Sequence, residues 1–206
     1  MSVLELFQKG GPVMYLLVIC SIAVTVIGIE RWRFYRYVEG ECEVFLKNLP
    51  GWLKSVPLAE CMERCGKQDS VLGYLAENGI QAAIDGEDVS LAVDMAYGQI
   101  AMKLRAGLNY LSMIVTLAPL LGLLGTISGM IESFSIFNLQ AGQPLAITGG
   151  IGEALVATAT GLCVAIFALL VHTYLAQRLD EELTLLDRAS AVVLNGLGCR
   201  RTEHEA

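Results

Sequence analysis

One segment of the chain begins with a carboxylate and continues with apolar residues: Gly152-Glu153-Ala154-Leu155-Val156-Ala157-Thr158-Ala159-Thr160-Gly161. The residues that follow stay apolar to about Leu175, interrupted only by hydroxyl side chains and His172. About 20 apolar residues are enough to cross a bilayer. A carboxylate at the edge of such a span is costly and tends to mark an ion path. Glu153 is therefore the first indication of function.

Two further apolar segments precede this one, so three spans are predicted, at residues 12–29, 111–131 and 154–175. The 206-residue chain is 54% hydrophobic and only 17% charged, whereas soluble domains average about 25% charged residues. No Lys or Arg occurs between Ala106 and Gln177. We predict an all-α membrane protein with three transmembrane helices, in which spans two and three extend into the cytoplasm as long helices.

The basic residues predict the orientation of the spans. Lys9 alone precedes span one, nine Lys and Arg lie in 30–110, none lies in 132–152, and four Arg lie in the C-terminal segment. Basic loops stay on the cytoplasmic side. We therefore expect 1–11 outside as an interfacial helix, 30–110 inside as a helical region, 132–153 outside as a turn, and 176–206 inside as a helix and tail. The aromatic and basic segment 30–36 predicts that span one is retained as a helix rather than cleaved as a signal peptide.

Helical patterns and break signals organise the segments outside the spans. In the cytoplasmic region, breaks are predicted at 48–51, 65–70 and 84–88, where Gly, Pro, Asn and Asp gather. One helix is predicted from near Ser90 to Phe137, and span three is predicted to continue to about Asn195. The outer turn is expected at 138–150.

Small residues recur every four positions in spans two and three. Gly122 belongs to one such series, Gly125 and Gly129 to a second, and Gly161 to a third in span three. This spacing lets helices approach closely in lipid, so these glycines are predicted packing residues. Pro119 lacks a backbone donor and is expected to bend span two.

Two hydroxyl groups are expected at similar depth in these spans. Thr158 lies five residues inside Glu153, or about 7.5 Å along the helix. Thr126 lies six residues inside Glu132 on the opposite-running span two, or about 9 Å. A carboxylate above hydroxyls suits the passage of water and protons, although either Thr alone could simply bond to its own helix. His172, about 28 Å from Glu153, is either an inner-side proton relay or an interfacial residue that ends the span.

Few other chemistries have support in the sequence. Cys61 and Cys65 are one helical turn apart, but no second ligand pair follows them, so they indicate incidental thiols rather than a metal or redox site. A nucleotide-binding Gly-rich loop, a metal cluster with ligand spacing and a nucleophile with a base partner are all missing from the sequence. We therefore expect no enzyme activity, no cofactor, no bound metal and no nucleic acid, with the proton as the translocated ion.

Two long motifs resemble a known family. Residues 118–134 closely resemble the span-two signature of the MotA/TolQ/ExbB proton-channel family, and residues 151–162 resemble its span-three signature. Three spans resemble the ExbB/TolQ branch rather than the four-span flagellar branch. Carried over by position, the resemblance implies that Thr126, Glu153 and Thr158 are the pore residues.

The resemblance also implies an assembly. Such proteins form a ring in the bacterial inner membrane, usually a homopentamer, with a periplasmic N-terminus and a cytoplasmic C-terminus. Its pore surrounds two copies of a single-span ExbD- or TolR-like partner. An Asp of that partner exchanges protons, and the resulting motion is passed to a TonB- or TolA-like protein that spans the periplasm. The resemblance thus implies that the chain is a subunit of a proton-driven motor and that lipid surrounds the ring.

Two alternatives belong to other functional classes. A passive scaffold could use the small-residue helices only to assemble a membrane complex. A thiol-redox membrane protein would depend on Cys61 and Cys65. Substitution of Glu153 by Gln separates the motor from the scaffold, because only the motor requires a carboxylate there.

Overall fold

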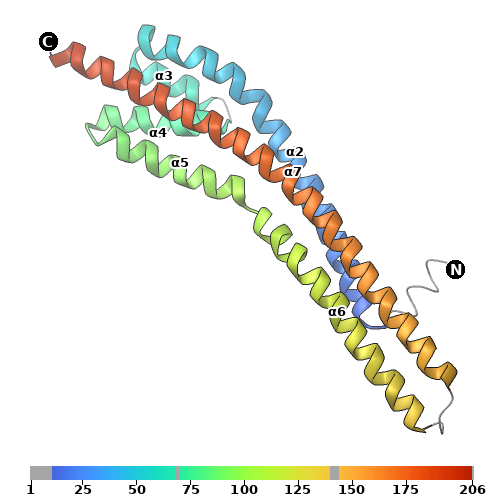
Figure 1. The fold of residues 1–206 in the computed structure, drawn as a ribbon. Helices are drawn as coiled ribbons and strands as arrows, with labels where there is room; N and C mark the ends of the chain where they lie inside the picture. The colour runs from blue at the N-terminus through green and yellow to red at the C-terminus, as the bar shows by residue number, and fades with distance from the viewer. Residues whose placement is uncertain (1–10, 68–69, 140–143, 206) are drawn as a thin grey trace. The chain divides into compact units, whose positions relative to one another are not determined.

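A computed structural model describes residues 11–67, 70–139 and 144–205 of the chain. The described residues form six helices and no strand, as predicted for an all-α protein. The helices are α2 (Val13–Ser55), α3 (Leu58–Gly66), α4 (Val71–Asp85), α5 (Val89–Arg105), α6 (Leu108–Leu139) and α7 (Pro144–Glu205) (Figure 1). The interfacial helix predicted for the first residues lies outside the described residues.

Three segments are long and apolar enough to cross a membrane. They are Val13–Val38, Val89–Ser135 and Gly150–Cys199, each of which overlaps one predicted span. The second and third measure 47 and 50 residues, longer than the roughly 20 residues that a bilayer requires. The predicted fold class is therefore confirmed.

The chain divides into two compact units. Unit 1 comprises residues 1–30 and 107–175, and unit 2 comprises residues 31–106 and 176–206. Unit 1 contains the start of α2, all of α6 and the first part of α7. At the start of α2, Val13, Met14 and Leu17 form an apolar cluster with Ala118 of α6 and Ala165 of α7. This cluster brings all three helices of unit 1 together.

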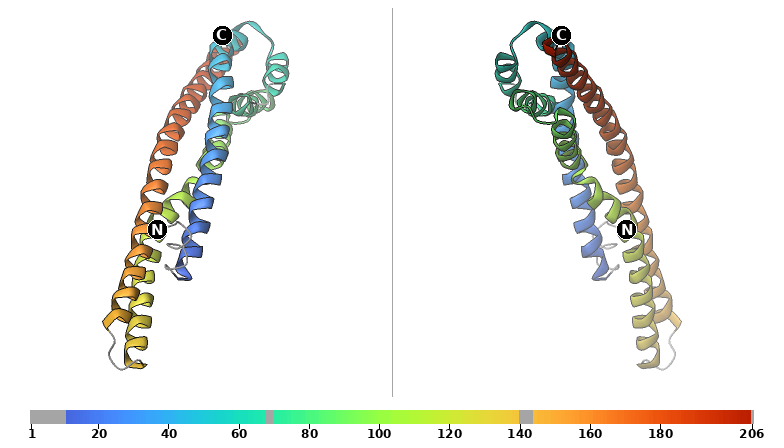
Figure 2. Two further views of the ribbon diagram at one scale, coloured as in Figure 1. Left: turned by 90° about the vertical axis from the view of Figure 1, so that its right-hand side faces the viewer. Right: turned by 90° about the vertical axis from the view of Figure 1, so that its left-hand side faces the viewer.

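Unit 2 contains the short helices and the remaining parts of α2 and α7. In this unit α4 packs against both α3 and α5, and Figure 2 shows the two short helices α3 and α4 followed by α5. The Ser70 hydroxyl accepts from the Gly73 N–H at 3.0 Å and so caps α4. Gly86, with φ 75°, ends α4, and the Asp88 carboxylate caps α5. These are the turn residues that mark helix boundaries in sequences.

One break predicted between residues 30 and 110 is wrong. The sequence predicts an interruption at 48–51, but α2 continues through Pro50 to Ser55. The side chains of Phe45, Leu49 and Leu53 are fully buried along this part of α2. Their burial offsets the backbone bond that the proline removes. The chain instead turns at Pro57, the N-cap of α3.

The predicted continuous helix from Ser90 to Phe137 is also wrong in one place. It is divided into α5 and α6 at Ala106 and Gly107. Ala106 has ψ 138° and Gly107 has φ 90°, a conformation that glycine tolerates and other residues avoid. The break signals at 65–70 and 84–88 do coincide with helix ends.

The turn predicted at 138–150 is helical at both of its ends. Helix α6 continues to Leu139 and α7 begins at Pro144, so both helices enter the segment 138–150 that was expected to be turn. Residues 140–143 lie outside the described residues. Helix α7 also continues past the predicted end near Asn195, to Glu205.

Candidate functional site

Glycines allow α6 and α7 to meet backbone to backbone in unit 1. A Cβ placed on Gly161 would lie 2.6 Å from the carbonyl oxygen of Ala118. A Cβ placed on Gly122 would lie 3.1 Å from the Cα of Thr158. No Cβ fits at Gly161 unless the facing backbone shifts, and at Gly122 the facing backbone would have to give by a few tenths of an ångström. Close approach of this kind is the packing expected of small residues in lipid.

The seam between α6 and α7 continues toward the C-terminal end of α6. A Cβ on Gly125 would meet the Cβ of Ala157 at 2.6 Å, and one on Gly129 would meet the Cβ of Ala154 at 3.1 Å. Further out, the side chain of Ser133 occupies the position where a Cβ of Gly150 would stand. All the glycines expected to pack helices therefore lie on this one seam.

Thr158 forms a hydrogen bond across the seam. Its hydroxyl donates to the carbonyl oxygen of Gly122 on α6 at 3.0 Å, and the residue is half-buried. For this Thr, the alternative of a bond to its own helix does not hold. A helix carbonyl already accepts from the N–H four residues later, here Thr126, so Thr158 uses its second lone pair.

Thr126 lies one helical turn further along α6. Its hydroxyl donates to the carbonyl oxygen of Leu123 at 2.7 Å, a bond within its own helix. Both hydroxyl protons are thus donated to carbonyls, and the lone pairs of both oxygens remain as acceptors. The level of Thr158 corresponds to Gly122, so the two hydroxyl-bearing residues are separated by about one turn, or about 6 Å, along α6.

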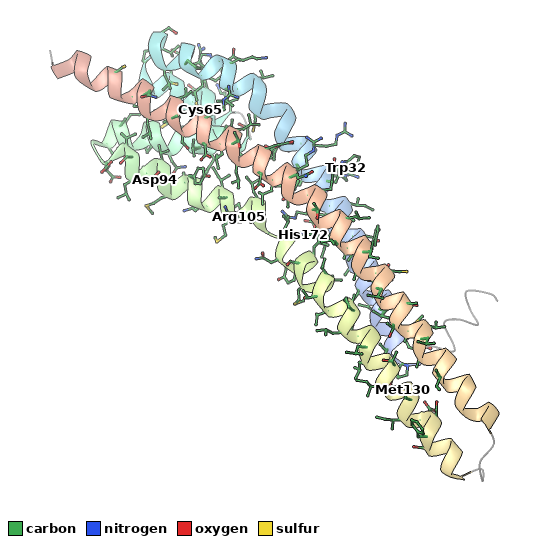
Figure 3. The ribbon with its side chains drawn as sticks, viewed as in Figure 1. Trp32, Cys65, Asp94, Arg105, Met130 and His172 are labelled. Atoms are coloured by element: carbon green, nitrogen blue, oxygen red, sulfur yellow. The ribbon has the colours of Figure 1, made fainter. Side chains whose placement is uncertain are left out.

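Glu153 lies in α7, and its side chain is outside the described residues. His172 is half-buried on the same helix, fourteen residues after Thr158, a rise of about 21 Å. In Figure 3 His172 lies toward the opposite end of unit 1 from Met130, which is near the C-terminal end of α6. The seam does not bring His172 close to the two Thr residues.

The cysteine pair lies in unit 2 and is fully buried. A hydrogen bond with Cys61 and burial both raise the pKa of the Cys65 thiol above its ordinary value. A protonated, buried thiol is a poor nucleophile and a poor metal ligand. Among the described residues, no group of three or more His, Cys, Asp and Glu is arranged to hold a metal ion.

Sequence patterns could not identify the acceptor of the Thr158 hydroxyl. That acceptor is a backbone carbonyl, which leaves no side-chain signal. The only trace of it in the sequence is the glycine at 122, because a larger residue would keep α7 too far away for the bond. The small-residue spacing therefore indicated the packing but not the hydrogen bond that the packing permits.

The fold and seam define a class: a helical membrane protein with three candidate spans, two of which pack through glycine and are joined by the hydrogen bond of Thr158. A model of the MotA/TolQ/ExbB proton channel family matches residues 67–188, more than half of the chain. The chain belongs to this family, and its relatives assign it to the ExbB branch.

Three relatives illustrate the similarity. The putative biopolymer transport protein ExbB-like 1 of Synechocystis is 32% identical over 185 residues, which cover 87% of this chain and 73% of the relative. The biopolymer transport protein ExbB of Neisseria gonorrhoeae is 27% identical over 198 residues, covering 85% and 87%. An ExbB homolog of Methanothermobacter thermautotrophicus is 24% identical over 188 residues, covering 90% and 67%. Similarity to these proteins extends well beyond the two motifs.

Proposed function

We propose that this chain is the ring-forming subunit of a proton-driven motor, with a pathway that uses Glu153, Thr126 and Thr158. The observation that carries the proposal is the α6–α7 seam, where Thr158 bonds to the Gly122 carbonyl one turn from Thr126. Membership in a proton-channel family supports the same function. The chain would lie in the bacterial inner membrane with its N-terminus in the periplasm and its C-terminus in the cytoplasm.

The hydroxyl geometry gives the two Thr residues a specific task. Each donates its proton to a carbonyl, so each oxygen is held in place with its acceptor lone pairs free for water. Ordered acceptors would align a short file of water beneath Glu153. The carboxylate would then attract protons to the entrance of the pathway. Ionisable side chains in membrane spans commonly mark the paths of ions and protons.

A partner is needed to convert proton flow into work. A proton that crosses the membrane releases about 2.3 kcal/mol per 100 mV of membrane potential. A permanently open pore would waste this energy. We therefore propose that five copies surround two single-span ExbD- or TolR-like subunits, whose Asp groups gate the transfer, and that the motion drives a TonB- or TolA-like protein.

The main experiment replaces Glu153 with Gln in the complex that contains the partner. Proton entry into vesicles is followed with a pH-sensitive dye under an imposed potential. We expect the variant to lose proton flow, because Gln has the size of Glu but cannot exchange protons. Native mass spectrometry should show that the complex is still intact. E132Q, one residue before the buried Ser133 at the outer end of α6, is the matched control and should retain flow.

A passive scaffold is the second candidate, and it makes the opposite prediction. If E153Q conducts protons as the unchanged chain does, the pathway assignment is wrong and the scaffold is favoured. Proton flow through the ring alone that equals flow through the full complex would instead overturn the gating by the partner. A monomer or dimer by native mass spectrometry, with no small subunit bound, would overturn the ring itself.

A further inference from the structure

The C-terminal end of α5 is held by side chains of α2. Tyr35 is buried, and its hydroxyl donates to the carbonyl oxygen of Leu104 at 2.8 Å. The guanidinium of Arg31 donates to the carbonyl oxygen of Lys103 at 3.3 Å. The last four carbonyls of a helix have no partner within the helix, and a cation near them is favoured. Two of the four such carbonyls of α5 are satisfied from α2.

These two carbonyls are the ones that an uninterrupted helix would use. In an α-helix the N–H of each residue donates to the carbonyl four residues earlier. The N–H groups of Gly107 and Leu108 would therefore donate to Lys103 and Leu104. Instead α5 ends at Arg105 (Figure 3), and α6 begins at Leu108. The two carbonyls therefore accept hydrogen bonds from side chains of α2 in place of backbone N–H groups.

A single glycine does not account for this break. Gly costs about 1 kcal/mol relative to Ala inside a helix, and this chain includes helical glycines without interruption, such as Gly79 in α4 and Gly98 in α5. Breaking the helix forfeits backbone hydrogen bonds, so the broken form requires compensating contacts. The bonds from Arg31 and Tyr35 supply them.

Helix α7 contributes a third side chain to this cluster. Glu182 is only 6% exposed, and both Glu182 and Arg31 act electrostatically on the hydroxyl of Tyr35. The three groups therefore share one polar cluster within unit 2. A buried carboxylate is costly unless a cation compensates it, and Arg31 is the cation of this cluster.

We propose that Arg31, Tyr35 and Glu182 form a conformational latch that selects the broken α5–α6 segment over a continuous helix. In the broken form Arg31 and Tyr35 donate to the two carbonyls that the N–H groups of Gly107 and Leu108 would satisfy in a continuous helix, so they compensate the broken form for the backbone bonds that it lacks. Glu182 is a positioning residue, because its buried carboxylate favours a cation in this cluster and so favours the place of Arg31 beside α5. Release of the latch returns the backbone at Ala106 and Gly107 to helical conformation. This inference rests on contacts within unit 2 and does not depend on the proton pathway.

Hydrogen–deuterium exchange of the full-length chain in lipid nanodiscs tests the latch at the amides of residues 107 and 108. G107A serves as the background, because alanine disfavours φ 90° and brings the two forms closer in free energy. Relative to G107A, Y35F/G107A is expected to slow exchange of these amides roughly fivefold, the equivalent of one neutral hydrogen bond. E182Q/G107A is also expected to slow the exchange of these amides.

Neighbouring residues provide matched controls. Tyr37 has an exposed ring on the same helix as Tyr35, and exposed Glu181 pairs with Arg178 at 2.9 Å. Y37F/G107A and E181Q/G107A are expected to exchange as G107A does. Unchanged or faster exchange at 107 and 108 in Y35F/G107A overturns the proposal, because the side chains would then only cap α5.

A second variant covers the possibility that loss of Tyr35 unfolds unit 2. If amides of α4 also exchange faster in Y35F/G107A, R31Q/E182Q/G107A takes its place. This variant removes both charges together and leaves no buried charge uncompensated. Slower exchange at residues 107 and 108 is again expected, and faster exchange there overturns the latch.

Discussion

Two tightly packed glycines of unit 1 meet backbone atoms, whereas two tightly packed glycines of unit 2 meet side chains. In unit 1, a Cβ on Gly122 or Gly161 would meet backbone atoms of the facing helix. In unit 2, a Cβ on Gly79 or Gly196 would meet side chains, those of Val93 and Val193 in one case and that of Leu53 in the other. Lipid supplies no hydrophobic drive between helices, so unit 1 relies on close backbone approach. Unit 2 relies on burying large apolar side chains and on capped helix ends.

The largest effect should come from the apolar core of unit 2. Phe45 is fully buried and meets the Trp52 ring edge-on at 5.9 Å between ring centroids. F45A is expected to lower the free energy of unfolding by about 3–5 kcal/mol, because a buried aromatic side chain leaves a cavity. Thermal unfolding of the purified protein measures the change. V44A, at the exposed neighbouring residue, should leave the unfolding midpoint nearly unchanged.

A smaller effect is expected at the seam of unit 1, and it tests the contrast between glycines directly. G161A should cost about 1–3 kcal/mol, because the new methyl group meets a backbone oxygen that cannot move alone. G196A should cost much less, since the nearest atom is the flexible end of Leu53. Unfolding of both variants under the same conditions measures the difference. Equal costs would show that the two units do not differ in this way.

Hydroxyl groups should also differ between the units. The Ser70 side chain caps α4, so S70A is expected to cost about 1 kcal/mol. The Thr160 hydroxyl bonds to the Val156 carbonyl of its own helix at 2.8 Å, and T160V is expected to change stability by less than about 0.5 kcal/mol, because that carbonyl keeps its helix bond. Chemical unfolding measures both. A larger loss in T160V would assign this hydroxyl a role in packing between helices.

The sequence was sufficient for much of this fold because its signals are local. Runs of apolar residues located the three candidate spans, and Gly86 with Asp88 marked a true helix boundary. Pro50 led to a wrong prediction of a helix break. The burial of Phe45, Leu49 and Leu53 stabilises the helix by more than the proline destabilises it. The break at Gly107 was missed because it depends on distant residues. The side chains that bond to the end of α5, those of Arg31 and Tyr35, lie some 70 residues earlier in the chain.

The candidate site followed the same division between local and distant information. The spacing of small residues predicted close packing of spans two and three, and the glycines it named do lie on one seam. That the Thr158 hydroxyl reaches the carbonyl of Gly122 depends on how α7 is rotated against α6, which spacing alone does not specify. The roles of Glu153 and His172 in proton transfer stay predictions.

The last prediction concerns the reactivity of thiols in unit 2 rather than stability, and it compares a buried pair with an exposed cysteine. The hydrogen bond with Cys61 and burial both raise the pKa of Cys65, so at pH 8 the thiol stays protonated, whereas the thiolate is the reactive form. Iodoacetamide at pH 8, followed by peptide mass spectrometry, is expected to label exposed Cys199 and to leave Cys61 and Cys65 unlabelled until the protein is unfolded. Labelling of Cys65 in the folded protein as fast as Cys199 would contradict the buried core of unit 2 and return the cysteine pair to consideration as a redox site.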